Sequence, residues 1–99
     1  MLIIIGTIRL PPERLAAARG PMSAMATASR AEDGCIHYAY AEDVLDPGLI
    51  RVSEIWRDQV ALDRHFQSPH IADWRAAWPD LAIRDRQLTG YDATNPRPV

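Results

Sequence analysis

Hydrophobic residues cluster or alternate in four stretches of this chain that are short enough to be strands. Residues 2–10 form an isoleucine-rich run of the kind found in buried strands. Residues 35–42 and 50–56 predict two more strands. The Asp-Pro-Gly sequence at 46–48 between them is typical of a turn, because proline presets the backbone and glycine accepts unusual angles. This pair therefore forms a predicted hairpin, and residues 81–91 carry the apolar pattern of a last strand.

A helical pattern separates the first strand from the hairpin. Apolar residues recur at helical spacing between residues 12 and 30, which places them on one narrow stripe of a helix. Gly20 and Pro21 fall inside this pattern. Because proline removes a backbone hydrogen bond and crowds the preceding turn, we expect a kink here or two short helices.

Two shorter helices are predicted between the hairpin and the last strand. Asp58 is placed to cap a helix over residues 59–67, since its side chain accepts from the free N–H groups of a first turn. Ser68 is a second capping residue, and Pro69 suits the first position of the helix that follows. We expect that helix to end where Pro79 interrupts the hydrogen-bond ladder.

The order of these elements is strand, helix, strand, strand, helix pair, strand. It predicts an α+β fold of the ferredoxin-like, split βαββαβ type, with a four-stranded antiparallel sheet and helices on one face. A chain of 99 residues forms one domain, which we place at residues 1–92, followed by a C-terminal tail at 93–99. The free face of the sheet needs a cover, and a second copy of the chain would supply it in a homodimer.

Composition and charge exclude several classes of function. The net charge of -2 gives no electrostatic reason to bind nucleic acid. All 11 basic residues are arginine, which excludes a Schiff-base lysine and a Walker-type phosphate site. The lone Cys35 forms no intramolecular disulfide. The N-terminal apolar run lacks a basic leader and is too short to span a membrane, so we expect a cytoplasmic protein without membrane contact.

The stretch from Glu32 to Trp74 resembles the central signature of the antibiotic biosynthesis monooxygenase (ABM) family. The resemblance is carried by Gly34-Cys35 with Tyr38, Glu54 with Trp56, Ala61-Leu62, His65-Phe66, Ser68-Pro69 and His70. It implies a homodimer in which two sheets face each other as a dimeric α/β-barrel. Substrate would lie between each sheet and its helices.

The resemblance implies several chemistries, because the family is diverse. Its members include cofactor-free quinol or aromatic monooxygenases, haem-degrading enzymes and an isomerase of a signalling sugar derivative. The haem-degrading members use an asparagine near the end of the first strand, where this chain has Gly6-Thr7. Haem degradation is therefore disfavoured.

His65 is the candidate catalytic residue. The resemblance favours a general base or a substrate-orienting group, since histidine exchanges protons near neutral pH. The alternative is a helix-end histidine bonded to a free carbonyl. We assign His70 to the edge of the substrate pocket. The two histidines are five positions apart and Pro69 breaks the helix between them, so one helical face cannot present both and no metal site is predicted.

Trp74, Tyr38 and Trp56 are the candidate walls of a substrate pocket. A flat aromatic substrate needs aromatic neighbours of this kind. Trp74 is the strongest candidate, because it follows His70 by four positions on one helix face. The alternative for each residue is packing in the core.

Glu54 is a carboxylate within a predicted strand, on the same face as Trp56. An inward-facing carboxylate could accept a substrate proton. We expect it instead to pair with an arginine such as Arg51 or Arg57, or with a group of the partner subunit.

These residues lead to the hypothesis of a small monooxygenase that oxidises a quinol or a hydroxylated, polyketide-like aromatic with dioxygen. The chain has no glycine-rich nucleotide loop and no cysteine cluster, so the simplest hypothesis uses no cofactor. His65 would take the proton of the substrate, and Trp74 and Tyr38 would hold its ring. The alternatives are a non-catalytic dimeric module that binds a small ligand and an isomerase of a small oxygenated metabolite.

Overall fold

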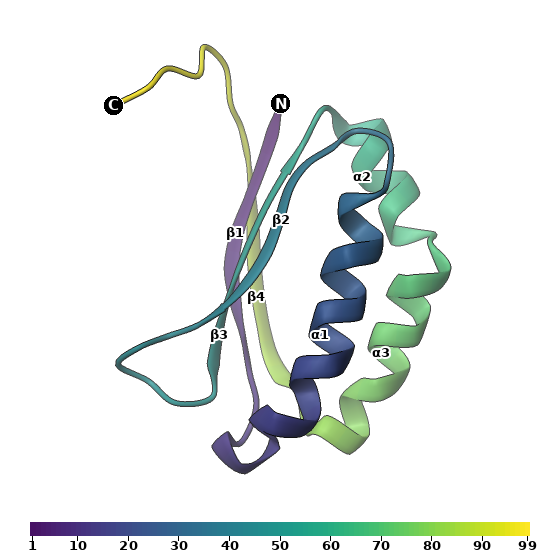
Figure 1. Ribbon diagram of the computed structural model, residues 1–99. Helices are drawn as coiled ribbons and strands as arrows, with labels where there is room; N and C mark the ends of the chain where they lie inside the picture. Colours follow the sequence, from purple (N-terminus) through teal and green to yellow (C-terminus); the bar gives the residue numbers. More distant parts are fainter.

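The computed structural model describes residues 1–99, and its helices and strands follow the predicted order (Figure 1). The strands are β1 (Leu2–Arg9), β2 (Cys35–Glu42), β3 (Leu49–Trp56) and β4 (Arg84–Asp92). The α-helices are α1 (Leu15–Arg30), α2 (Gln59–Phe66) and α3 (Pro69–Leu81). One short 3-10 helix, Pro12–Arg14, precedes α1.

The strands form one antiparallel sheet in the order β2-β3-β1-β4. The three α-helices cover one face of this sheet and leave the other face open (Figure 1). This is the predicted α+β, split βαββαβ arrangement. Because side chains alternate across a strand, each central strand sends every second residue under the helices.

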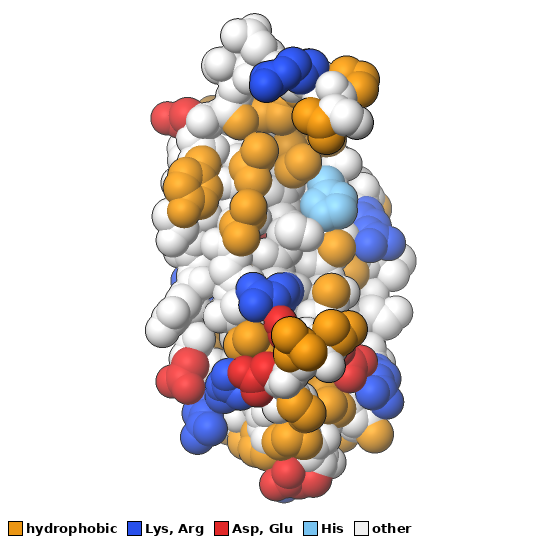
Figure 2. Space-filling view, turned by 90° about the vertical axis from the view of Figure 1, so that its left-hand side faces the viewer, with side chains coloured by type: hydrophobic (Ala, Val, Ile, Leu, Met, Phe, Trp, Pro, Cys, Tyr) orange, Lys and Arg blue, Asp and Glu red, His pale blue; other side chains and the backbone are white.

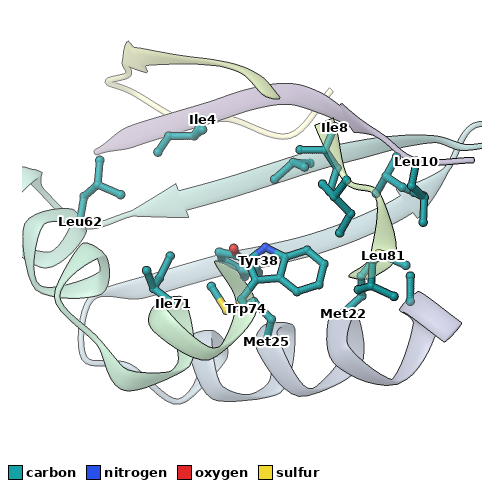
Figure 3. Packing of buried hydrophobic residues seen from close by; sticks show 14 of the residues in the cluster. Ile4, Ile8, Leu10, Met22, Met25, Tyr38, Leu62, Ile71, Trp74 and Leu81 are labelled. Atoms are coloured by element: carbon teal, nitrogen blue, oxygen red, sulfur yellow. The ribbon is translucent and has the colours of Figure 1, made fainter. Parts of the chain in front are cut away.

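The core fills the space between the sheet and the helices (Figure 3). It is built from both layers and includes Ile4, Ile8, Ile50, Val52 and Trp56 of the sheet and Ala18, Met22, Met25, Leu62, Ile71 and Trp74 of the helices. Each large apolar side chain contributes roughly 1.5–3 kcal/mol when fully buried. This packing fixes the helices over the sheet and so positions the residues between them.

The first helix is one continuous element, so of the two predicted outcomes at Gly20-Pro21, a kink or two short helices, the second is wrong. Pro21 lies inside α1. It removes one backbone donor, but the buried face of the helix continues on both sides of it through Ala18, Met22 and Met25. Packing of this face outweighs the lost hydrogen bond.

The third helix passes through Pro79 and ends at Leu81, so the predicted stop at Pro79 is also wrong. Ala82 adopts a left-handed conformation with φ 54° and ψ 36°. The N–H of Ile83 then donates to the carbonyl of Trp78 at 3.1 Å. This is a hydrogen-bonded helix end of the kind that usually terminates helices, and it moves the start of β4 to Arg84.

The two predicted capping residues are confirmed. The side chain of Asp58 accepts a backbone N–H in the first turn of α2. The hydroxyl of Ser68 accepts the N–H of Ile71 at 3.3 Å and donates to the carbonyl of His65 at 2.7 Å. Ser68 therefore fixes the turn between α2 and α3.

An apolar patch lies on the open face of the sheet. We call it the open-face patch, and it consists of Ile3, Ile5, Ile55 and Tyr91. The register places Ile3 between Ile55 and Tyr91, and Ile5 and Tyr91 are 54% and 55% exposed. Figure 2 shows hydrophobic side chains in both halves of this face and most of the charged side chains in its lower half.

The N-terminus lies beside the residue that follows β4. The terminal amino group of Met1 donates to the carbonyl of Ala93 at 3.0 Å, and the N–H of Ala93 donates to the carbonyl of Met1 at 2.8 Å. Beyond this point residues 94–99 contain no helix or strand. None of the helices combines the length and apolar character needed to cross a membrane.

Candidate active site

A small cavity lies between the sheet and the helices α2 and α3. Its volume is about 30 Å³, and its walls include Tyr38, Tyr40, Glu54, His65 and Trp74. One water molecule occupies roughly 10–15 Å³ by this measure. The closed cavity therefore has room for water or dioxygen but not for an aromatic ring, which would enter only after a wall residue moves.

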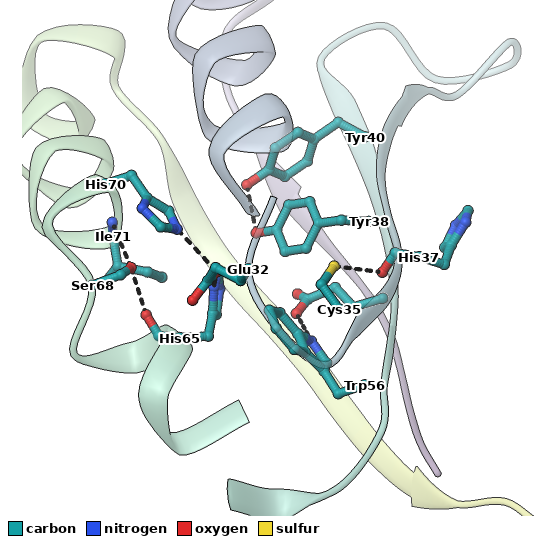
Figure 4. A network of polar contacts seen from close by, with 11 residues as sticks. Glu32, Cys35, His37, Tyr38, Tyr40, Trp56, His65, Ser68, His70 and Ile71 are labelled. Carbon is teal, nitrogen blue, oxygen red and sulfur yellow. Dashed lines mark hydrogen bonds and ion pairs between the residues drawn. The ribbon is translucent and has the colours of Figure 1, made fainter. Parts of the chain in front are cut away.

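His65, near the end of α2, is buried and bonded to an acid. Its Nδ1 lies 2.5 Å from Oε2 of Glu32, in the loop between α1 and β2 (Figure 4). An ionised carboxylate only accepts, so Nδ1 carries the hydrogen and Nε2 keeps its lone pair. Burial lowers the pKa of His65 even though Glu32 opposes the shift, so the ring is neutral at neutral pH.

The same Glu32 oxygen binds a second histidine. Nε2 of His70, in the first turn of α3, lies 3.0 Å from Oε2 of Glu32. As expected, no single helical face presents both histidines, since His65 lies on α2 and His70 on α3, but the turn at Ser68 lets both reach Glu32. Their ring centroids are 5.8 Å apart. We call Glu32, His65 and His70 the Glu32 cluster.

Trp56 supports His65 from the core. Its ring is fully buried, and its centroid lies 4.6 Å from that of His65. The indole N–H donates to Oε1 of Glu54 at 2.8 Å. The predicted pairing of Glu54 with Arg51 or Arg57 is therefore wrong, since both arginines pair with aspartates elsewhere. Burial raises the pKa of Glu54, while the bond from the indole opposes this shift.

Two tyrosines add hydroxyl groups to the cavity wall. The hydroxyl oxygens of Tyr38 and Tyr40 are 3.1 Å apart. The Tyr38 ring lies 5.5 Å from the ring of His65, and the Tyr40 ring lies 5.6 Å from the ring of Trp74. Burial raises the pKa of both tyrosines far above the usual range, so they stay protonated and act as hydrogen-bond donors.

The exposed wall residues mark the mouth of the cavity. Phe66 and Arg75 both line it and both are exposed. The Arg75 guanidinium lies 6.0 Å from the centre of the Phe66 ring. Trp74 also lines a groove of about 390 Å³ between α1 and α3, together with His70.

A second groove, of about 290 Å³, runs between α1 and β2. Its charged residues already have partners. Arg19 forms a bidentate pair with Glu42, and Arg30 donates to the carbonyl of Tyr38 at 2.8 Å. The one carboxylate of this groove, Glu42, is held by Arg19, so the unpaired ring nitrogen of His65 makes the smaller cavity the better candidate.

The residues selected from the sequence lie in three positions. Tyr38, His65 and Trp74 are walls of one cavity. Trp56 packs behind His65, and His70, a member of the Glu32 cluster, lines the groove between α1 and α3.

Glu32 is the functional candidate that sequence reasoning did not find. Its histidine partners are 33 and 38 positions away, so no local spacing indicates the contact. The only indication in the sequence is the position of Glu32, between the end of a predicted helix and Gly34.

Comparison with known proteins identifies the class of this chain. The sequence profile of the family described as "antibiotic biosynthesis monooxygenase" matches residues 1–77. The chain belongs to this family.

Solved structures agree with that assignment. A Deinococcus radiodurans protein, provisionally described as an antibiotic biosynthesis monooxygenase, superposes with a TM-score of 0.92 at 30% identity, covering 100% of this chain and 98% of that one. Rv0793 of Mycobacterium tuberculosis gives a TM-score of 0.83 at 33% identity, covering 96% of each chain. PA3566 of Pseudomonas aeruginosa gives 0.84 at 29% identity, covering 95% of this chain and 94% of that one.

Sequence relatives extend the comparison. Rv0793, provisionally named a monooxygenase, is 38% identical over 78 residues, which are 79% of this chain and 76% of that protein. The uncharacterised protein sll1783 of Synechocystis is 29% identical over 90 residues. That match covers 91% of this chain, which spans only 61% of the length of sll1783.

Proposed function

We propose that the protein is a cofactor-independent monooxygenase that oxidises a quinol or another hydroxylated aromatic with dioxygen. The observation that carries this proposal is the hydrogen bond from His65 to Glu32. It leaves a buried, neutral base in the wall of an aromatic-lined cavity. Membership of the monooxygenase family and the provisional name of Rv0793 support the same reaction class.

His65 would start the reaction by taking the phenolic proton on Nε2. Its Nδ1–H bond to Glu32 holds the required tautomer and stabilises the imidazolium that forms. A phenolate is a far better electron donor than the phenol, so it reduces dioxygen directly. Arg75 and Arg86, both in the cavity wall, favour the anion by their charge.

The overall step balances without a further reductant. The ring gives four electrons to dioxygen. One oxygen atom bonds to a ring carbon and becomes a carbonyl, and the other leaves as water with the phenolic hydrogen and the hydrogen displaced from that carbon. The product is a quinone. Water exclusion by the surrounding aromatic rings would protect the charged intermediates.

Substrate binding would require the cavity to open. The closed volume of about 30 Å³ does not hold a ring. Trp74 is the residue whose movement would add the neighbouring groove of about 390 Å³, which brings the space into the range of small-molecule sites, roughly 300–1,000 Å³. Tyr38 and Trp74 would then contact the two sides of the ring, and the hydroxyl of Tyr38 would donate to a substrate oxygen.

We further propose that two chains pair through the open-face patch to form a homodimer. Ile5 and Tyr91 stand more than half exposed on a face that no helix covers. A contiguous apolar patch of this kind marks an association surface. A second copy would present the same patch, so the contact is self-complementary about a two-fold axis.

The test is oxygen uptake by untagged, metal-stripped protein with a panel of quinols and polycyclic phenols. We expect uptake above the autoxidation blank that is lost on boiling. His65→Ala should remove at least about 99% of it, since acid–base groups contribute typically 10²–10⁴-fold. His37→Ala is the matched control, because His37 is an exposed histidine outside the cavity.

Two outcomes would contradict the proposal. Uptake no higher than the blank with every compound would favour the isomerase or the binding module. Equal uptake by the His65→Ala variant, with the fold intact by circular dichroism, would return His65 to a structural role.

A further inference from the structure

The Glu32 cluster brings three metal-ligating groups together from separate segments of the chain. Glu32 lies between α1 and β2, His65 on α2 and His70 on α3. Their donor atoms, one per residue, all lie within 4.8 Å of one another. Figure 4 shows the carboxylate of Glu32 between the two imidazole rings. Two imidazoles and one carboxylate form a donor set that suits zinc and other first-row transition metals.

We propose that the Glu32 cluster binds one divalent transition-metal ion, with Glu32, His65 and His70 as its three protein ligands. Because a carboxylate accepts, Nδ1 of His65 and Nε2 of His70 would each donate a hydrogen to Oε2 of Glu32. A single divalent cation would take the place of both hydrogens and satisfy the same three atoms. In each neutral ring the hydrogen would move to the other nitrogen, so the two imidazoles stay neutral ligands.

The spacing of the donors is compatible with this exchange. Ligand bonds of about 2.0–2.2 Å place neighbouring donors about 3–3.5 Å apart. The two contacts to Glu32, at 2.5 and 3.0 Å, are already near or below that spacing. Only the distance between Nδ1 of His65 and Nε2 of His70 has to become shorter. The side chains of Glu32 and His70 are 17% and 22% exposed, so they have the freedom to adjust and a route for the ion from solvent.

The surroundings favour binding in two further ways. His65 is almost completely buried and cannot move away, so it provides a fixed ligand. Three protein ligands leave at least one coordination position for water, as in open zinc sites. The ion would sit at the surface end of the cluster, where His70 also borders the groove between α1 and α3.

Metal binding would have a defined consequence for His65. A metal on Nδ1 places the ring hydrogen on Nε2, which then donates and no longer accepts. This part rests on the proposed function, because it predicts that the metal inhibits a reaction in which Nε2 accepts a proton. The cluster would thus be a point where a metal ion and the substrate proton compete for the same imidazole.

The experiment uses the full-length, untagged chain after treatment with EDTA and desalting. Zinc is titrated by calorimetry, and cobalt(II) is followed by its visible absorption, which reports bound nitrogen and oxygen donors. We expect one ion per chain. Glu32→Gln and His70→Ala should each weaken zinc binding at least about tenfold, the loss seen when even groups that only orient a ligand are removed. His37→Ala should bind as the wild type does.

Thermal unfolding of each variant without metal shows whether it is folded. If His70→Ala folds poorly, Glu32→Gln still tests the site, because glutamine has the same shape as glutamate and keeps a hydrogen-bond acceptor. The inference is overturned if zinc does not bind to the wild type, or if it binds to Glu32→Gln and His70→Ala as tightly as to the wild type.

Oxygen uptake separates the two proposals. Zinc binding without uptake by the metal-free protein would reject only the oxygenase, and uptake without zinc binding would reject only the metal site.

Discussion

The same kinds of residue lie on the two sides of the sheet in different environments. On the side that the helices cover, His65 of α2 is 1% exposed and bonded to Glu32. On the open face, His37 is exposed and its Nε2 lies 2.9 Å from Oγ of Ser53. Aromatic residues differ in the same way, since Trp56 is fully buried and Tyr91 is 55% exposed.

This difference supports the two proposals, chemistry on the side that the helices cover and association through the open face. Burial removes water from His65 and lowers its pKa, so its partner Glu32 decides its tautomer. His37 remains in contact with water, which competes for both ring nitrogens. The open face offers exposed apolar surface, but it does not hold polar groups in a fixed arrangement as Glu32 holds His65. The predictions below test this contrast, beginning with the largest expected effect.

Replacing Trp56 by alanine should give the largest loss of stability. The side chain is fully buried, supports the ring of His65 and satisfies Glu54. Its removal leaves a cavity and a buried carboxylate without its donor, so we expect a loss of about 3–5 kcal/mol. Urea unfolding followed by circular dichroism measures it.

The matched control is Tyr91→Ala, an aromatic residue of the open face. In protein diluted until it is monomeric, this change should reduce the free energy of unfolding by less than about 1 kcal/mol, as exposed substitutions usually do. Equal losses for the two variants would show that both faces contribute alike to folding.

Replacing Ile5 by arginine should break association while leaving the single chain folded. Ile5 lies two residues from Ile3, at one end of the open-face patch, and is 54% exposed, with Ser53 and Thr89 as its neighbours across the sheet. An unpaired charge buried at this position would weaken a dimer by about 3 kcal/mol, or roughly 100-fold in the dissociation constant. Sedimentation velocity over a range of concentrations measures this. A wild type that is monomeric throughout, or a variant with unchanged association, would refute the pairing.

The same contrast explains what could be predicted from the sequence. The strands follow from local apolar patterns, and the caps at Asp58 and Ser68 follow from local hydrogen bonds. The effects of Pro21 and Pro79 were overestimated, because packing of α1 and the hydrogen-bonded end of α3 outweigh one missing donor each. The first error concerns a helix held by packing against distant parts of the chain, and the second a helix end held by a hydrogen bond between residues on either side of the proline.

The site was predictable only in part, for the same physical reason. Tyr38 and Trp74 were placed by strand and helix periodicity. The contact of Glu32 with two histidines depends on the return of α2 and α3 over the sheet, which no local spacing reports. The indole donor for Glu54 is two residues away on the same strand, but an arginine partner was chosen because carboxylates usually pair with charges.

Replacing Glu54 by glutamine should change how stability depends on pH. Burial raises the pKa of Glu54 in the folded state, so the folded chain binds this proton more tightly than the unfolded chain. Stability is therefore lost as pH rises from the ordinary carboxyl pKa through the raised one. Glutamine still accepts the indole N–H of Trp56 but carries no charge, and we expect a gain of about 1 kcal/mol at pH 8.

The measurement is urea unfolding of both proteins between pH 4 and pH 8. The difference between the two curves isolates Glu54, since every other titrating group is shared. It should grow as pH rises and then become constant. Parallel curves at all pH values would mean that Glu54 ionises in the folded chain as easily as in the unfolded chain.

Replacing His37 by alanine should have the smallest effect. The change removes one hydrogen bond to Ser53 between exposed side chains. Water replaces such a bond, so the free energy of unfolding should change by no more than about 0.5 kcal/mol. Urea unfolding of the monomer measures this change. His37 lies opposite Ile55 at the edge of the open-face patch, so sedimentation of the variant shows whether the His37 ring also contributes to pairing. A loss of more than about 1 kcal/mol in the free energy of unfolding of the monomer would mean that the single chain depends on a polar contact of the open face. The contacts of His37 and His65 would then differ only in strength.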